Sequence, residues 1–82
     1  MTKVVHCKHE LYNVYIGRPS IWGNPFIIGK DGTREEVIKK YEIWVKTQSL
    51  DFGILKNQIL GCWCKPLACH GDILAKLADE SN

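Results

Sequence analysis

The sequence lacks both a long apolar run and a block of like charge. No apolar stretch approaches the ~20 residues that a membrane-spanning helix needs, so we expect no membrane association. Eleven Lys and Arg residues are interleaved with nine acidic residues, and the net charge is only +2. A charge this small and this dispersed argues against a nucleic-acid-binding protein.

The sequence also lacks a secretory signal, internal repeats and any linker-like stretch. Its first ten residues contain Lys but no apolar region like that of an export signal, so we expect a cytoplasmic protein. The length of 82 residues predicts one small domain over residues 1–82. In a reducing compartment the four cysteines would be thiols or metal ligands, although their even number also permits disulfides.

Three short stretches are typical of β-strands. They span residues 4–5, 14–16 and 59–64 and are rich in Val, Ile and Tyr or alternate in character. Pro66 is expected to end the third strand, because proline lacks the N–H that a sheet requires. The first two strands could be hairpin-like neighbours or edge neighbours, and the sequence leaves both arrangements open.

Two helices and a short helical turn complete the predicted elements. A capping box formed by Thr33 and Glu36 predicts a helix over 34–47, and apolar residues recur within it at helical spacing. A short turn is expected over 51–57. The last helix should start near His70 or Gly71, and the tail over 79–82 should fray.

The order of these elements predicts an α/β fold. A helical crossover separates the second strand from the third, which favours parallel pairing of these two strands. We therefore expect a three-stranded sheet with at least one parallel pair, packed with two main helices and a short helical turn. Ligands collect beyond the carboxyl ends of such strands. The loop over 18–26 and the segment over 64–72 follow two such ends, so they should meet and form a cleft.

The segment over 61–72, GCWCKPLACHGD, concentrates reactive side chains and supports two interpretations. In the first, Cys62, Cys64, Cys69 and His70 bind zinc, since thiolates and imidazole are its usual ligands. The alternative is that Cys62 is a core thiol and the others form a tight turn. In the second interpretation, Cys69, His70 and Asp72 are catalytic, because a thiol at a helix start has a lowered pKa. Asp72 could instead only stabilise the helix start.

The loop over 18–32 contains candidate ligand-binding residues. Arg18 offers a planar donor fork suited to phosphate or carboxylate, and Ser20 and Asn24 offer neutral polar contacts. Trp22, or Trp63 if it reaches the cleft, could stack on a base. A nucleotide or nucleobase is the ligand that this combination indicates, while ordinary packing of the tryptophans and a surface role for Arg18 are the alternatives.

Several motifs together resemble a known family. VYIGR at 14–18, GNPF at 23–26, CWC at 62–64 and CHGD at 69–72 are similar to the motifs of small bacterial and phage proteins grouped as a domain of unknown function. The resemblance covers roughly residues 14–77. It implies a stand-alone intracellular domain, often phage-borne, and it supplies no reaction.

Three functions are consistent with these observations. The protein could bind or process a nucleotide or nucleobase in a Cys- and His-rich pocket. It could be a zinc-stabilised structural or interaction module, with zinc as its cofactor. It could also be a phage protein that sequesters a nucleotide or binds a host protein. Whether it is an enzyme is left open.

Overall fold

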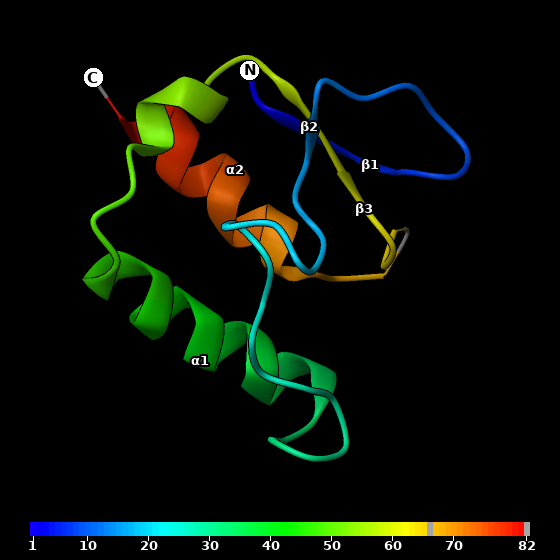
Figure 1. The fold of residues 1–82 in the computed structure, drawn as a ribbon, viewed down its shortest axis with the longest axis vertical. Helices are drawn as coiled ribbons and strands as arrows, with labels where there is room; N and C mark the ends of the chain where they lie inside the picture. The colour runs from blue at the N-terminus through cyan, green and yellow to red at the C-terminus, as the bar shows by residue number, and fades with distance from the viewer. Residues whose placement is uncertain (66, 82) are drawn as a thin grey trace.

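The computed structural model describes residues 1–65 and 67–81 (Figure 1). Two strands come first, and a helix, a single turn of 3-10 helix named η1, a third strand and a last helix follow. In chain order they are β1 (Lys3–His6), β2 (Val14–Tyr15), α1 (Arg34–Thr47), η1 (Phe52–Leu55), β3 (Ile59–Cys62) and α2 (His70–Glu80).

The strands form one parallel sheet in the order β1-β3-β2. This confirms the α/β class and the parallel pairing of β2 with β3. It also decides the relation that the sequence left open, because β3 lies between β1 and β2 and they are not neighbours. Backbone hydrogen bonds continue on both sides of β3, from Cys7 N to Cys62 O at 2.8 Å and from Ile16 N to Gly61 O at 2.9 Å. All three carboxyl ends therefore reach the same edge of the sheet.

The third strand ends two residues earlier than predicted. β3 stops at Cys62, and the chain turns at residues 63–65, where Leu67 N donates to Cys64 O at 2.8 Å. Cys64 is therefore part of a turn and not of the strand. The predicted role of Pro66 in ending the strand concerns a residue outside those that the structure describes.

Helix α2 lies between the sheet and α1 (Figure 1). It contacts β1 and β3 of the sheet, and it also contacts η1 and α1. No helix within the described residues has the length and apolar character needed to cross a membrane. The core is continuous through these layers, and its fully buried members include Ile16, Tyr41, Val45, Leu55, Leu60, Cys62, Leu74 and Ala78.

Helix α1 begins at the predicted capping box. Glu36 N donates to Thr33 Oγ1 at 3.2 Å, and Thr33 N donates to Glu36 Oε1 at 2.9 Å. These reciprocal bonds satisfy two backbone donors that have no partner inside the helix. The buried face of α1 carries Val37, Tyr41 and Val45, in agreement with the predicted periodicity.

The two ends of the chain meet at the C-terminal end of α2. Thr2 donates to Asp79 Oδ1 from its backbone N at 3.0 Å and from Oγ1 at 2.7 Å. The prediction that the tail frays from residue 79 is wrong for Asp79 and Glu80, which are helical. Residue 82 lies outside the described residues.

The contact between Thr2 and Asp79 predicts that part of the free energy of unfolding depends on pH. Hydrogen bonds from Thr2 hold the pKa of the Asp79 carboxyl below its ordinary value. A carboxyl whose pKa is lower in the folded state contributes stability above its unfolded pKa, and this contribution is lost as the pH falls. We therefore expect Asp79→Asn to lower the melting temperature at neutral pH, and we expect the difference from the wild type to shrink as the pH falls from about 4, the unfolded pKa of Asp, through the lower pKa of the folded carboxyl.

Circular dichroism melts at several pH values would measure this difference. Glu80→Gln is the matched control, because Glu80 is the exposed neighbouring acid on the same helix. It should leave the melting temperature almost unchanged at every pH. An Asp79→Asn protein as stable as the wild type at neutral pH would contradict the assignment.

Candidate functional site

A cavity of about 490 Å³ lies at the carboxyl edge of the sheet. It is enclosed by the loop after β2, the first turns of α1 and the segment between β3 and α2, so the two segments predicted to meet do meet there. In Figure 1 the cyan segment passes from β2 across the beginning of α2 toward α1. The predicted site residues among those that line the cavity are Arg18, Asn24, Cys64, Cys69 and His70.

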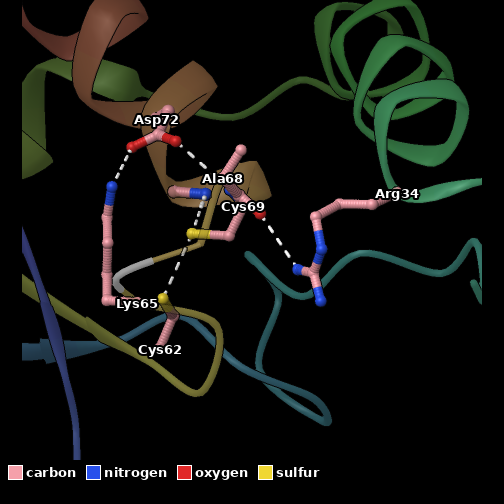
Figure 2. A network of polar contacts seen from close by, with 7 residues as sticks. Arg34, Cys62, Lys65, Ala68, Cys69 and Asp72 are labelled. Atoms are coloured by element: carbon pink, nitrogen blue, oxygen red, sulfur yellow. Dashed lines mark hydrogen bonds and ion pairs between the residues drawn. The ribbon is translucent and has the colours of Figure 1, made fainter.

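The charges at the cavity are of one sign. Both arginines of the chain, Arg18 and Arg34, line it, and the described lining residues include no Asp, Glu or Lys. Arg34 Nη1 donates to Ala68 O at 3.0 Å and so joins the start of α1 to the segment before α2 (Figure 2). The cavity therefore offers guanidinium groups to an anion, and no described acid in its lining neutralises them.

Arg34 was not among the residues identified from the sequence. It is the first residue of α1 and follows the capping Thr33, a position that by itself indicates an ordinary exposed charge. Its partner Ala68 is 34 residues away. No local pattern connects the two, so only the packing of α1 beside α2 could have identified Arg34.

Asn24 lies in the cavity wall, but both ends of its side chain are already bonded. Oδ1 accepts from Phe26 N at 2.9 Å, and Nδ2 donates to Val37 O at 3.3 Å. The first bond shapes the turn around Pro25, and the second ties the loop to α1. Asn24 therefore positions the wall, and a ligand would have to share its amide.

Trp22 and Ser20 were expected to line the cavity, but neither residue does. Trp22 is only 4% exposed and packs in the core against Phe52 at 6.1 Å between ring centroids. Its carbonyl accepts from Tyr41 Oη at 2.7 Å. Ser20 Oγ is buried and has no hydrogen-bond partner within residues 1–65 and 67–81. The loop is folded inward at these residues, so neither side chain lines the cavity.

Trp63 takes the place in the cavity wall that was expected of Trp22. It lines the cavity with 54% of its surface exposed. Its Nε1 donates to Tyr15 Oη at 2.6 Å, and the ammonium of Lys8 lies 5.4 Å from the ring centroid. Tyr15 in turn packs on Gly17, where an added Cβ would lie 2.3 Å from the phenol oxygen. Only glycine at residue 17 permits this packing, and the packing holds the indole in place.

Cys62 and Cys69 form a buried pair of sulfurs below the cavity (Figure 2). Their Sγ atoms are 3.1 Å apart, and Cys69 Sγ also accepts from Gly71 N at 3.3 Å. Cys69 is the N-cap of α2. The hydrogen bond from Cys69 lowers the pKa of the Cys62 thiol, and the same bond together with burial raises the pKa of the Cys69 thiol. When one of the two thiols ionises, the remaining proton is therefore shared between the two sulfurs.

Asp72 serves the start of α2 and not the cavity. Its Oδ2 accepts from Cys69 N at 3.2 Å, which completes a capping box, and its Oδ1 pairs with Lys65 Nζ at 2.5 Å (Figure 2). The three predicted catalytic residues, Cys69, His70 and Asp72, are close in space. Within the described residues, however, their side chains make no hydrogen bonds to one another that could relay a proton.

His70 connects α2 to the end of β2. Its Nε2 lies 2.7 Å from Ile16 O, and its ring meets Tyr41 edge-on with the centroids 5.0 Å apart. A carbonyl can only accept, so Nε2 carries the proton. Burial lowers the pKa of His70, which keeps the imidazole neutral. Nδ1 has no hydrogen-bond partner among the described residues and retains its lone pair.

The predicted zinc ligands do not converge as a set of four. Two thiolates on one zinc would lie about 3.8 Å apart, given Zn–S bonds of about 2.3 Å in a tetrahedron, whereas Cys62 and Cys69 are in closer contact. The donor nitrogen of His70 bonds to Ile16 O. Within the described residues, no group of three or more His, Cys, Asp or Glu could hold a metal. The described residues do not fit this zinc site.

Together, the fold and the cavity define a small parallel α/β domain with an arginine-lined pocket at its carboxyl edge. The chain belongs to the family "Domain of unknown function (DUF4326)", whose model matches residues 3–80. This confirms the resemblance found in the motifs.

Two viral proteins are similar to the chain. One is the "Uncharacterized 12.4 kDa protein in nrdA-td intergenic region" of Enterobacteria phage T4, 34% identical over 88 residues, which cover 98% of this chain and 80% of that protein. The other is "Uncharacterized protein R718" of Acanthamoeba polyphaga mimivirus, 34% identical over 85 residues. That match covers 79% of this chain but only 65% of the mimivirus protein. No solved structure matches the chain.

The contact of Tyr41 with the loop predicts a clear loss of stability on removal of one hydroxyl. Tyr41 is fully buried, and Tyr41→Phe leaves the Trp22 carbonyl without its partner. An unpaired buried acceptor costs about 1–3 kcal/mol. Urea unfolding should show this decrease in the free energy of unfolding. Tyr12→Phe removes the hydroxyl of an exposed tyrosine and should change it by less than about 0.5 kcal/mol. Equal effects of the two variants would contradict the role of Tyr41.

Proposed function

We propose that the protein binds a small phosphate-bearing molecule of the nucleotide class in the cavity at the carboxyl edge of the sheet. The proposal rests on Arg18 and Arg34, which both line the cavity. The described lining residues include no Asp, Glu or Lys. Guanidinium groups bind phosphate through two parallel hydrogen bonds, and a cavity of one charge sign attracts the opposite sign.

The apolar part of the cavity favours a nucleotide as the ligand over inorganic phosphate. Trp63 and Phe26 line it together with Ile27, Ile28 and Ile38. Its volume of about 490 Å³ is within the range of roughly 300–1,000 Å³ for pockets that bind small molecules. An aromatic ring held in place, as Trp63 is, provides a surface on which a base can stack.

The start of α2 contributes a neutral group and not a charge. Cys69 and His70 are the N-cap and first residue of this helix, and both line the cavity. The Asp72 carboxylate and Cys69 Sγ already accept from the first N–H groups of the helix, so the two arginines supply the positive charge for an anion. His70 is neutral and adds no charge, but Nδ1 is available to accept a hydrogen bond from a ligand hydroxyl or amine.

Titration calorimetry with nucleoside 5′-monophosphates and with the matching nucleosides would test the proposal. We expect the monophosphates to bind more tightly. Arg34→Gln and Arg18→Gln should each weaken this binding by about tenfold or more, since a hydrogen bond to a charged group is worth about 1.5–3 kcal/mol and 1.4 kcal/mol is tenfold.

Lys39→Gln is the matched control for these variants. It removes one positive charge from an exposed residue of α1 outside the cavity lining, and it should leave the affinity unchanged. Equal binding of nucleosides and monophosphates, or equal effects of Lys39→Gln and Arg34→Gln, would refute an arginine-based phosphate site.

Two alternative roles are sequestration of a nucleotide in the cavity and binding to a host protein through another surface. Sequestration of a nucleotide without turnover needs only the cavity, and the absence of product after long incubation with the bound nucleotide would separate it from catalysis. Binding to a host protein is a distinct hypothesis, to be tested by mixing the purified protein with host proteins.

The four free cysteines support a cytoplasmic location, where thiols stay reduced.

The zinc-stabilised module remains a separate prediction, although the described side chains do not form its four-ligand site. Metal analysis of protein purified without added zinc would decide it. One zinc per chain, with unfolding on addition of a chelator, would establish the module. A stoichiometry near zero would rule the module out.

A further inference from the structure

Cys62 and Cys69 are close enough to react with each other. Both thiols are free, Cys62 is fully buried and Cys69 is 2% exposed. Their Sγ atoms lie 3.1 Å apart, whereas a disulfide bond is about 2.05 Å long. An inward movement of about 1 Å would therefore join them.

The elements that carry the pair explain this proximity. Cys62 is the last residue of the central strand, where it pairs with His6 of β1 and its carbonyl accepts from Cys7 N. Cys69 is the N-cap of α2, where its extended backbone directs the side chain back toward the sheet. The two sulfurs therefore meet between two rigid elements, although six residues separate them in the chain.

A reagent can reach only one of the two thiols through the cavity. Cys69 is among the lining residues and Cys62 is not. Cys62 has the lower pKa of the pair, so Cys69 reacts when the proton that the two sulfurs share passes to Cys62. Cys69 is thus placed to react first and Cys62 to react second.

We propose that Cys62 and Cys69 form a dithiol site that exchanges reversibly with small disulfides such as glutathione disulfide. The Cys69 thiolate attacks one sulfur of the glutathione disulfide, a mixed disulfide forms, and the first glutathione leaves as a thiolate that takes up the proton lost by Cys69. Cys62 then attacks Cys69 Sγ as a thiolate. The second glutathione leaves and takes up the proton of Cys62. The cysteine pair loses two electrons, and one glutathione disulfide becomes two glutathione thiols.

Cys64 is the principal competitor for this reaction. It lines the same cavity and is partly exposed. Within the described residues its sulfur makes no contact with another sulfur, in contrast to the pair of Cys62 and Cys69. The proposal therefore assigns the intramolecular disulfide to residues 62 and 69 alone. It does not depend on nucleotide binding, because the exchange is measured without a nucleotide.

Disulfide mapping of the full chain tests the proposal. The protein is incubated at neutral pH with excess glutathione disulfide and quenched with acid, and the remaining thiols are alkylated after unfolding. Intact mass and peptide mapping should show loss of two hydrogen atoms, a bond between Cys62 and Cys69, and alkylated Cys7 and Cys64. Reduced glutathione in excess should restore the dithiol. Alkylation of both Cys62 and Cys69, or a disulfide that includes Cys64, would overturn the proposal.

Single variants test the order of attack. Cys62→Ala should accumulate a mixed disulfide of glutathione on Cys69, because the second thiol is gone. Cys69→Ala should leave Cys62 free of glutathione, and rapid modification of Cys62 in this variant would refute the assigned entry through Cys69. Cys7→Ser is the control and should form the disulfide at the wild-type rate, since Cys7 lies outside the cavity lining. Disulfide mapping of the wild-type protein tests the proposal even if one of these variants does not fold.

Discussion

Parallel pairing on both sides of β3 is the constraint on which the other features of the structure depend. Because β1 and β2 both run in the direction of β3, the chain leaves all three strands at one edge. The segments that follow β2 and β3 then lie next to each other, although α1, η1 and β3 separate them in the chain. Ligand sites in α/β proteins form at this kind of edge for the same reason.

The start of α2 converts this edge into a specific arrangement of side chains. Cys69, His70 and Asp72 are consecutive or nearly so, yet each contacts a different part of the molecule. Cys69 Sγ contacts Cys62, His70 Nε2 donates to Ile16 O, and Asp72 pairs with Lys65. One turn of helix thus joins β3, the end of β2 and the turn after β3. Side chains that are neighbours in a sequence diverge around a helix, which is why they do not form a catalytic relay here.

The cavity combines groups that suit an anion with an aromatic wall, and the buried sulfurs lie beside it. The two proposals draw on different parts of this region. Nucleotide binding depends on Arg18 and Arg34, whereas thiol–disulfide exchange depends on Cys62 and Cys69. Since Cys69 belongs both to the lining and to the sulfur pair, oxidation would alter the floor of the cavity. The relation to phage T4 and mimivirus proteins shows that the domain occurs in viruses.

Local physics accounts for what could be predicted from the sequence. The capping box of Thr33 and Glu36 and the apolar period of α1 are short-range patterns, and they placed this helix correctly. Strand–helix–strand order was enough to predict parallel pairing of β2 and β3, and hence the meeting of the two loops. The family motifs were equally accessible, because they are contiguous.

Tertiary structure decided the remaining features. The position of β3 between β1 and β2, the burial of Trp22 and the exposure of Trp63 depend on which apolar surfaces pack together. Arg34 reaches the cavity only because α1 packs beside α2. The contact of Cys62 with Cys69 depends on how a strand end meets a helix start. Sequence periodicity reports which face of an element is apolar, but not which partner covers it, and for this protein that partner determines the site.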